Sequence, residues 1–192
     1  MLRSTVGGMG QLTLDIVDPR LAAARAIDDI LARQQVAHAF VGEIAIGAWT
    51  GRRVESGAVD VLALVSPDRS QQIPMMASHR GFTVDPAEVE AARELDLVPM
   101  RWGSGDGSPR VHVLMATNAL YAKMLNRTVE ALLAGSPVPV VHAEDLALML
   151  ILSEREDVTV DDLATAAGDA FDRAHFDETL RSIGLAGKAV AR

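Results

Sequence analysis

The sequence predicts an α+β fold in which helices flank a mixed sheet and a helical part follows. Two apolar runs of strand length, residues 36–41 and 58–65, enclose a short segment with helical spacing. Residues 95–102 and 110–116 are two further apolar runs joined by a glycine- and serine-rich tip, which predicts a β-hairpin. Because helical patterns dominate after His142, we expect a core over residues 1–142 and a helical C-terminal part of the same domain over residues 143–192.

Composition fits one domain with an aliphatic core. The chain has 192 residues, of which 49% are hydrophobic and only 4% aromatic. Its net charge of −8 argues against nucleic acid as the main partner and against binding to an anionic membrane. The absence of cysteine excludes disulfides, thiol nucleophiles and cysteine–zinc sites. No apolar run reaches the ~20 residues of a membrane span, so we expect a cytoplasmic protein with no membrane partner.

The first helix is predicted from Asp18 to about Gln35. Aspartate is a good N-terminal cap, and the proline that follows it fits the first turn of a helix. Apolar residues then recur at helical spacing and share one face, which we expect to pack on a sheet. These residues are Leu21, Ala24, Ile27, Ile30 and Leu31.

A second helix is predicted over residues 43–50, between the two apolar runs. Small and apolar side chains stand at helical spacing there, and Gly51 provides a C-terminal cap. The apolar run after it contains one acid, Asp60. Aspartate is depleted in strands and is costly to bury unpaired, so we expect Asp60 at a strand end, in a cleft or beside a cation. A structural ion pair with Arg52 or Arg53 is the alternative to a catalytic role.

The second half of the chain continues to alternate helices with extended segments. Pro74 limits the helical pattern of residues 69–80 to short pieces, and Asp85 begins another helix. Thr117 is expected to cap a helix over residues 117–127, and Thr159 a helix over residues 160–167. Further segments are expected to be extended at 82–84, 128–133 and 138–141, and helical from 142 to about 155 and at 170–183.

Residues 36–67 resemble the nucleotidyltransferase fold, particularly the small abortive-infection type of nucleotidyltransferase toxin. In that family a strand ends in Gly-Gly or Gly-Ser, a short helix and a basic loop follow, and the next strand carries Asp-x-Asp. The corresponding pieces here are Gly42-Glu43, Gly51-Arg52-Arg53 and Ala58-Val59-Asp60. The resemblance implies a nucleotidyltransferase-like mixed sheet and assigns nucleotide binding to Gly42, Glu43, Arg52 and Arg53.

The resemblance also implies a chemistry, in which Mg²⁺ or Mn²⁺ supports transfer of a nucleotidyl group from a nucleoside triphosphate. Alternation in a strand places both acids of Asp-x-Asp on one face, where they offer carboxylates to the metal. Asp60 remains as the catalytic and metal-binding residue, whereas Ala58 has no ligand atom. His112 stands where relatives carry a third carboxylate, and imidazole is a poor ligand for Mg²⁺ but a fair one for Mn²⁺ or Zn²⁺. The histidines at 38, 79, 142 and 175 show no metal-ligand spacing.

Two functions from different classes follow from this pattern. Four positions depart from the family chemistry: Glu43, Ala58, His112 and Leu150, the last of which stands where relatives commonly carry a lysine. They favour a catalytically degenerate protein that acts as a binding or regulatory module, with no certain cofactor and with a nucleoside triphosphate or a protein as candidate partner. The alternative is an active metal-dependent nucleotidyltransferase that uses Asp60 with Glu43 or Glu55. A third option is a helix-mediated interaction protein, for which a large exposed apolar patch would be the sign.

Overall fold

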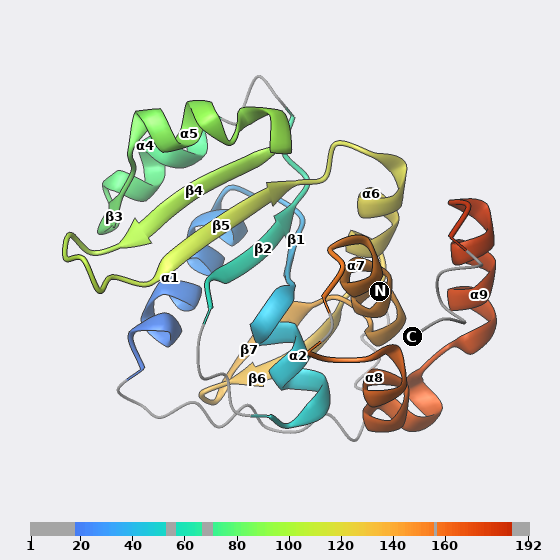
Figure 1. Ribbon diagram of the computed structural model, residues 1–192. Coiled ribbons are helices and arrows are strands. Elements are labelled where there is room, and N and C mark those ends of the chain that lie inside the picture. The colour runs from blue at the N-terminus through green and yellow to red at the C-terminus, as the bar shows by residue number, and fades with distance from the viewer. Residues whose placement is uncertain (1–17, 53–56, 67–70, 156, 186–192) are drawn as a thin grey trace.

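The computed structural model describes residues 18–52, 57–66, 71–155 and 157–185 (Figure 1). In chain order the elements are α1 (Pro19–Arg33), β1 (His38–Phe40), α2 (Gly42–Thr50), β2 (Val59–Ala63), α4 (Gln72–Ser78), β3 (Phe82–Thr83), α5 (Pro86–Ala91), β4 (Leu97–Trp102), β5 (Arg110–Met115), α6 (Ala119–Leu125), β6 (Val129–Leu133), β7 (Ser136–Val140), α7 (Ala143–Leu152), α8 (Val160–Ala167) and α9 (Arg173–Ser182). Short 3₁₀ turns lie at Arg93–Leu95 and Gly168–Ala170.

The described strands form one seven-stranded sheet in the order β3-β4-β5-β2-β1-β7-β6. Strand β2 runs parallel to β5, and β1 runs parallel to β7, whereas the other neighbours are antiparallel. The sheet is therefore mixed, and it is covered by helices, as the α+β prediction required. The predicted hairpin over residues 95–116 is confirmed as β4 and β5, which pair from Leu97 opposite Leu114 to Arg101 opposite Arg110.

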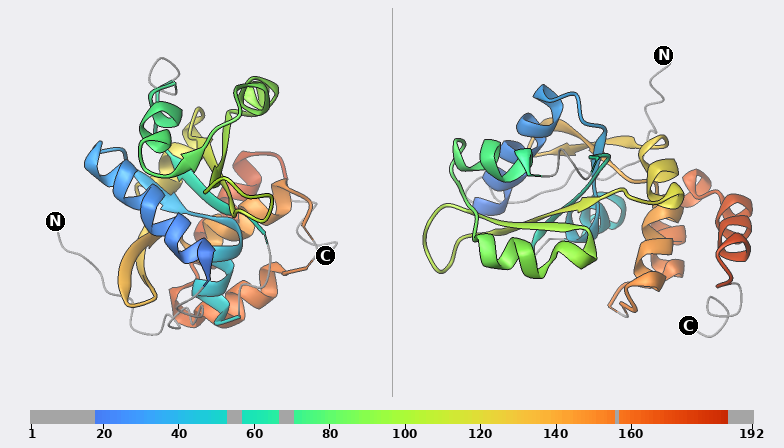
Figure 2. Two further views of the ribbon diagram at one scale, coloured as in Figure 1. Left: turned by 90° about the vertical axis from the view of Figure 1, so that its left-hand side faces the viewer. Right: turned by 90° about the horizontal axis from the view of Figure 1, so that it is seen from above.

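The helices form two groups around the sheet. Helix α1 contacts β1, β2 and β4, and its predicted apolar face is buried along its whole length. Helix α7 contacts both α8 and α9, and α2 contacts both α7 and α8 (Figures 1 and 2). The buried core is mainly aliphatic, as the composition predicted, with Phe40, Trp49, Phe82 and Phe176 as its aromatic members. None of the described helices is long and apolar enough to cross a membrane.

Three helix boundaries differ from the sequence expectation, each for a local reason. Asn118 rather than Thr117 caps α6, because its side chain accepts from the backbone N–H of Tyr121 while the threonine hydroxyl donates to Asp96. Pro74 lies in the first turn of α4, where a proline removes no helical hydrogen bond, so it does not divide the described helix. The last helix begins only at Arg173, after a 3₁₀ turn.

Two acids in the first turn of α7 are buried, with residue exposures of 0% for Glu144 and 2% for Asp145. Arg127 donates to one oxygen of Glu144, and Nδ1 of His142 lies 3.0 Å from the other. Burial acts to raise the pKa of Glu144, but the hydrogen bond from His142 and the charge of Arg127 outweigh it and hold this pKa below its ordinary value. Burial raises the pKa of Asp145, and Nε2 of His175 lies 3.9 Å from its Oδ1. The cluster thus joins the start of α7 to the end of α6 and to α9.

Candidate ligand pocket at the ends of β2 and β5

Asp60 and His112 lie side by side in the centre of the sheet. The two residues are direct partners in the parallel register of β2 and β5, so their side chains leave the sheet on the same face. Nδ1 of His112 lies 2.9 Å from Oδ1 of Asp60. A carboxylate can only accept a hydrogen bond, so Nδ1 carries the shared proton and Nε2 is left for other partners. Among the described residues, Nε2 of His112 has no hydrogen-bond partner.

The turn between β1 and α2 brings the backbone against this pair. Gly42 has φ +56°, a left-handed conformation that side chains rarely adopt. A Cβ atom at this position would lie 2.5 Å from Oδ2 of Asp60, which is closer than any real contact. The backbone N–H of Val41 also donates to the carbonyl of Asp60 at 3.0 Å. Glycine is therefore required at position 42, because the chain must turn left-handed and leave room for the carboxylate.

A pocket of about 360 Å³ opens over Asp60, His112 and Gly42. Strands β2, β4 and β5 and helices α6 and α7 all contribute to its lining. Most of the other lining residues are apolar: Val41, Leu97, Leu114, Tyr121, Leu146, Met149, Leu150 and Leu152, together with Ser153. Leu150, which the resemblance matches to a lysine of relatives, lines this pocket as a hydrophobic residue.

Arg155 also lines the pocket, and the sequence pattern did not single it out. Its backbone N–H donates to the carbonyl of Leu150, which places it directly after the last turn of α7. Its guanidinium donates to Glu43 at 2.5 Å and to Asp157. The hydrogen bond to Asp157, followed by that to Glu43, raises the pKa of Arg155 above its ordinary value. Glu43 is therefore held by a cation rather than left to repel an anionic ligand.

The two arginines predicted to bind nucleotide have different outcomes. Arg52 turns toward α8, where its side chain donates to the carbonyl of Asp157 at 3.4 Å and lies 3.8 Å from the carboxylate of Asp162. It is not among the residues that line the pocket, and it makes no ion pair with Asp60, whose recorded partner is His112. Arg53 and Glu55 lie outside the described residues.

The described donor set does not fit a magnesium site. Asp60 and His112 offer one carboxylate and one imidazole, and these two groups already bond to each other. Ala58, two residues before Asp60 in the chain, has no ligand atom. Across the described ranges no group of three His, Cys, Asp or Glu side chains is arranged to hold a metal ion. Mg²⁺ prefers near-octahedral coordination by oxygen, so this pair suits hydrogen bonding to a ligand better than metal binding.

Comparison with known proteins identifies the fold. No protein-family model and no curated protein sequence matches the chain. Among solved structures, the solution structure of the antibiotic-resistance factor ANT(2'')-Ia aligns with a TM-score of 0.56 at 17% identity, over 93% of this chain and 96% of that one. A crystal structure of ANT(2'')-Ia in complex with adenylyl-2''-tobramycin aligns with a TM-score of 0.51 at 16% identity, over 85% and 95% of the two chains.

A third structure, an antigenic nucleotidyltransferase-like protein from Paracoccidioides brasiliensis, aligns with a TM-score of 0.48 at 12% identity, over 90% and 94% of the two chains. Identities in this range show the fold alone. The two ANT(2'')-Ia structures confirm the expectation of a nucleotidyltransferase-like fold. The chain has a nucleotidyltransferase-like fold.

Proposed function

We propose that this protein is a catalytically degenerate member of the nucleotidyltransferase fold that binds a nucleotide in the Asp60 pocket without metal-dependent transfer. The hydrogen bond between Asp60 and His112 carries the proposal. An imidazole occupies the neighbouring-strand position at which relatives of the abortive-infection type carry a carboxylate. Asp60, the acid that would hold a metal, therefore bonds to the imidazole of His112 instead of lying beside a second carboxylate.

The charges around the pocket argue against metal-dependent transfer. A triphosphate needs cations to neutralise it, and active sites of this chemistry supply them as divalent metals. Here Arg155 lines the pocket, but Glu43 and Asp157 already bond to it. The described residues that line the pocket therefore offer a metal–triphosphate complex no more than one carboxylate. They include no cation without an acidic partner.

The apolar wall supports a nucleotide as the ligand. Tyr121, Met149 and Leu150 offer an aromatic ring and flexible apolar side chains, on which a nucleobase can pack. Nε2 of His112 is the acceptor nitrogen when Nδ1–H donates to Asp60, so it can accept a hydrogen bond from a ribose hydroxyl. The resemblance of residues 36–67 to abortive-infection nucleotidyltransferase toxins supports a nucleotide over other ligands of this size.

Calorimetric titration with ATP, GTP, CTP and UTP, each without metal and then with Mg²⁺ or Mn²⁺, tests this function. We expect at least one nucleotide to bind with an affinity that the metals do not change. Asp60→Ala removes a negative charge beside the phosphates, so it is expected to strengthen binding several-fold and to leave it indifferent to metal. Asp177→Ala is the matched control, because Asp177 is an exposed acid on α9 outside the pocket.

A variant that introduces the carboxylates expected from the family tests the same proposal from the opposite direction. In the double variant A58D/H112D, carboxylates would stand at positions 58, 60 and 112 on one face of the two strands, so Mn²⁺-dependent nucleotide binding is expected to appear. Metal-dependent binding by the native protein that Asp60→Ala abolishes, accompanied by transfer of label from an α-³²P-labelled nucleotide, would establish the active enzyme instead. If none of the four nucleotides binds, the proposal that the Asp60 pocket binds a nucleotide is refuted.

A further inference from the structure

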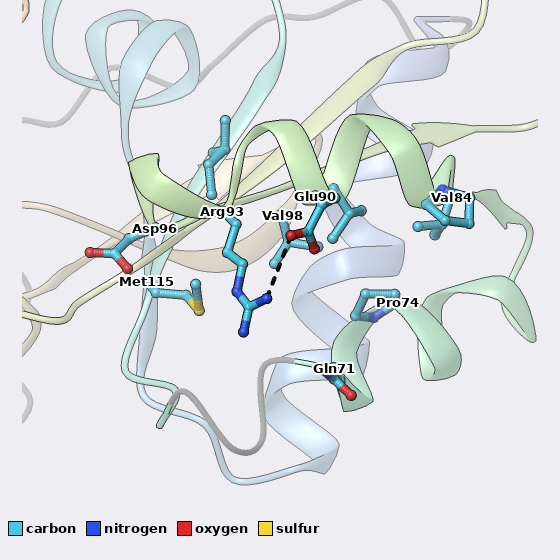
Figure 3. A pocket seen from close by; sticks show the side chains of 11 residues that line it. Gln71, Pro74, Val84, Glu90, Arg93, Asp96, Val98 and Met115 are labelled. Atoms are coloured by element: carbon cyan, nitrogen blue, oxygen red, sulfur yellow. Dashed lines mark ion pairs between the residues drawn. The ribbon is translucent and has the colours of Figure 1, made fainter.

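A second pocket, of about 450 Å³, lies between α4 and α5, away from the Asp60 site (Figure 3). We propose that it binds a small, uncharged and largely apolar molecule with a hydrogen-bonding group at one end. Its volume falls within the range of ligand sites in proteins, which is roughly 300–1,000 Å³. The described side chains that line it are Gln71, Pro74, Val84, Pro86, Val89, Glu90, Arg93, Asp96, Leu97, Val98 and Met115.

The floor and walls of this pocket are apolar. Val98 from β4 and Met115 from β5 are buried, and they form the floor where the two strands pair. Pro74 lines the pocket from α4 (Figure 3), and Val89 lines it from α5. An apolar molecule that enters would cover this surface and gain roughly 25 cal/mol for each Å² removed from water.

Helix α5 gives independent evidence that apolar surface beside the pocket is left uncovered. A surface helix normally buries one apolar face against the core, and that burial stabilises it. Helix α5 has no buried residue, and Val89 remains half-exposed although it lines the pocket. Val89 packs against the core with only part of its surface, so a ligand in the pocket would cover apolar surface that α5 leaves exposed.

The charges at the rim argue for an uncharged ligand. Arg93 lies 3.6 Å from Glu90, and both side chains are largely exposed, so the two charges at the mouth compensate each other (Figure 3). The carboxylate of Asp96 accepts from the hydroxyl of Thr117 at 2.6 Å and points away from Arg93 in the close view. An ionic group on the ligand would have to break one of these contacts, whereas a hydroxyl or amide can share the donors and acceptors of Gln71, Glu90 and Arg93.

The two pockets lie on opposite faces of β4 and β5. Leu97 and Leu114 are a cross-strand pair at the Asp60 pocket, whereas Val98 and Met115, one residue further along each strand, belong to the floor of the second pocket. Side chains alternate between the faces of a strand, and only Leu97, at the end of β4, is among the described residues that line both pockets. Met115 lines only the second pocket and Met149 only the first, which gives one methionine reporter for each site.

Fluorescence titration with the neutral apolar dye N-phenyl-1-naphthylamine tests the proposal. We expect a saturable rise in dye fluorescence with the full chain. Val89→Arg places a charged side chain at the pocket wall and is expected to weaken binding at least tenfold. Ala87→Arg is the matched control, because Ala87 is exposed on the same helix and does not line the pocket; it is expected to leave the affinity unchanged.

Methyl spectra of protein with ¹³C-labelled methionine locate the dye without any variant. The proposal requires the Met115 signal to shift with saturation of the dye while the Met149 signal stays in place. A shift of Met149 alone would place the dye in the Asp60 pocket and overturn the proposal. Absence of saturable binding, or equal binding by the Val89→Arg and Ala87→Arg variants, would overturn it as well.

Discussion

Two carboxylate–imidazole pairs in this molecule have the same contact and different surroundings. In the sheet, Nδ1 of His112 lies 2.9 Å from Asp60, and at the start of α7, Nδ1 of His142 lies 3.0 Å from Glu144. The side chain of Asp60 is 26% exposed and lines a pocket, whereas that of Glu144 is fully buried. Glu144 also accepts from Arg127, a partner that Asp60 lacks among the described residues.

This difference shows that the burial of a carboxylate–imidazole pair decides whether it stabilises the fold or remains available to a ligand. A fully buried carboxylate is costly unless its hydrogen bonds are satisfied, so Arg127 and His142 serve mainly to hold α7 against the core. A half-exposed carboxylate is solvated already, so His112 adds little stability to Asp60 and the pair remains available to a ligand. The following three predictions test this distinction in order of expected size.

Removal of the buried cation should have the largest effect. Arg127→Met leaves the Glu144 carboxylate buried with only His142 as a side-chain partner, which is expected to lower the free energy of unfolding by about 3–5 kcal/mol. Urea denaturation followed by circular dichroism measures this loss. The double variant R127M/E144Q removes the uncompensated charge and should recover most of the stability; a loss below about 1 kcal/mol for Arg127→Met would refute the structural role of the buried pair.

The same substitution in both pairs should separate them directly. His142→Ala leaves a buried oxygen of Glu144 without its partner and is expected to cost about 1–3 kcal/mol, to which the lost packing against Trp49 adds. His112→Ala is expected to cost about 1 kcal/mol or less, because water can solvate Asp60. Parallel urea denaturation of the two variants makes the comparison, and equal losses would contradict the assignment of different roles.

The neighbouring acid, Asp145, should respond to pH with the opposite sign from Glu144. Burial raises the folded-state pKa of Asp145, so its contribution to stability is present below the unfolded pKa and is lost as pH rises through the folded pKa. Asp145→Asn cannot ionise and is therefore expected to be more stable than the native protein at pH 7, by about 1 kcal/mol.

Stability curves at several pH values check this expectation. The advantage of Asp145→Asn should shrink as pH falls toward the ordinary pKa of aspartate, about 3.9. Asp177→Asn, on the exposed side of α9, is the control and should show no such dependence. If the stability advantage of Asp145→Asn does not change with pH, ionisation of Asp145 does not destabilise the folded protein.

Local sequence patterns predicted most elements because their signals are short-range. Asp18 caps α1 and Gly51 ends α2 with φ +68°, as the sequence indicated. Thr159 forms a capping box with Asp162, which accounts for the acids at the start of α8 without a functional site. The boundaries at Asn118 and Arg173 differed from the prediction. They depend on which of several nearby polar side chains caps the helix, and a sequence pattern does not show which one does.

The site was predicted in part. The sequence singled out Gly42, Asp60 and His112, and the structure brings all three to one pocket. It placed Leu150 there as well, but it did not indicate that Arg155 supplies a cation from beyond the end of α7 or that Glu43 pairs with it across 112 positions of sequence. No local signal identifies such a contact, because two segments distant in the chain meet only after the sheet and α7 have packed.

The sequence by itself determined the succession of helices and strands, the aliphatic core, and the presence of a single acid in the strand that follows the glycine turn. These follow from hydrophobic periodicity, turn residues and caps, which act over a few residues. Tertiary structure alone decided that Asp60 meets His112, that Glu144 is buried against Arg127, and that a second pocket opens under α5. These depend on strand register and on side-chain packing between distant segments, and the balance of burial against charge is set only where those segments meet.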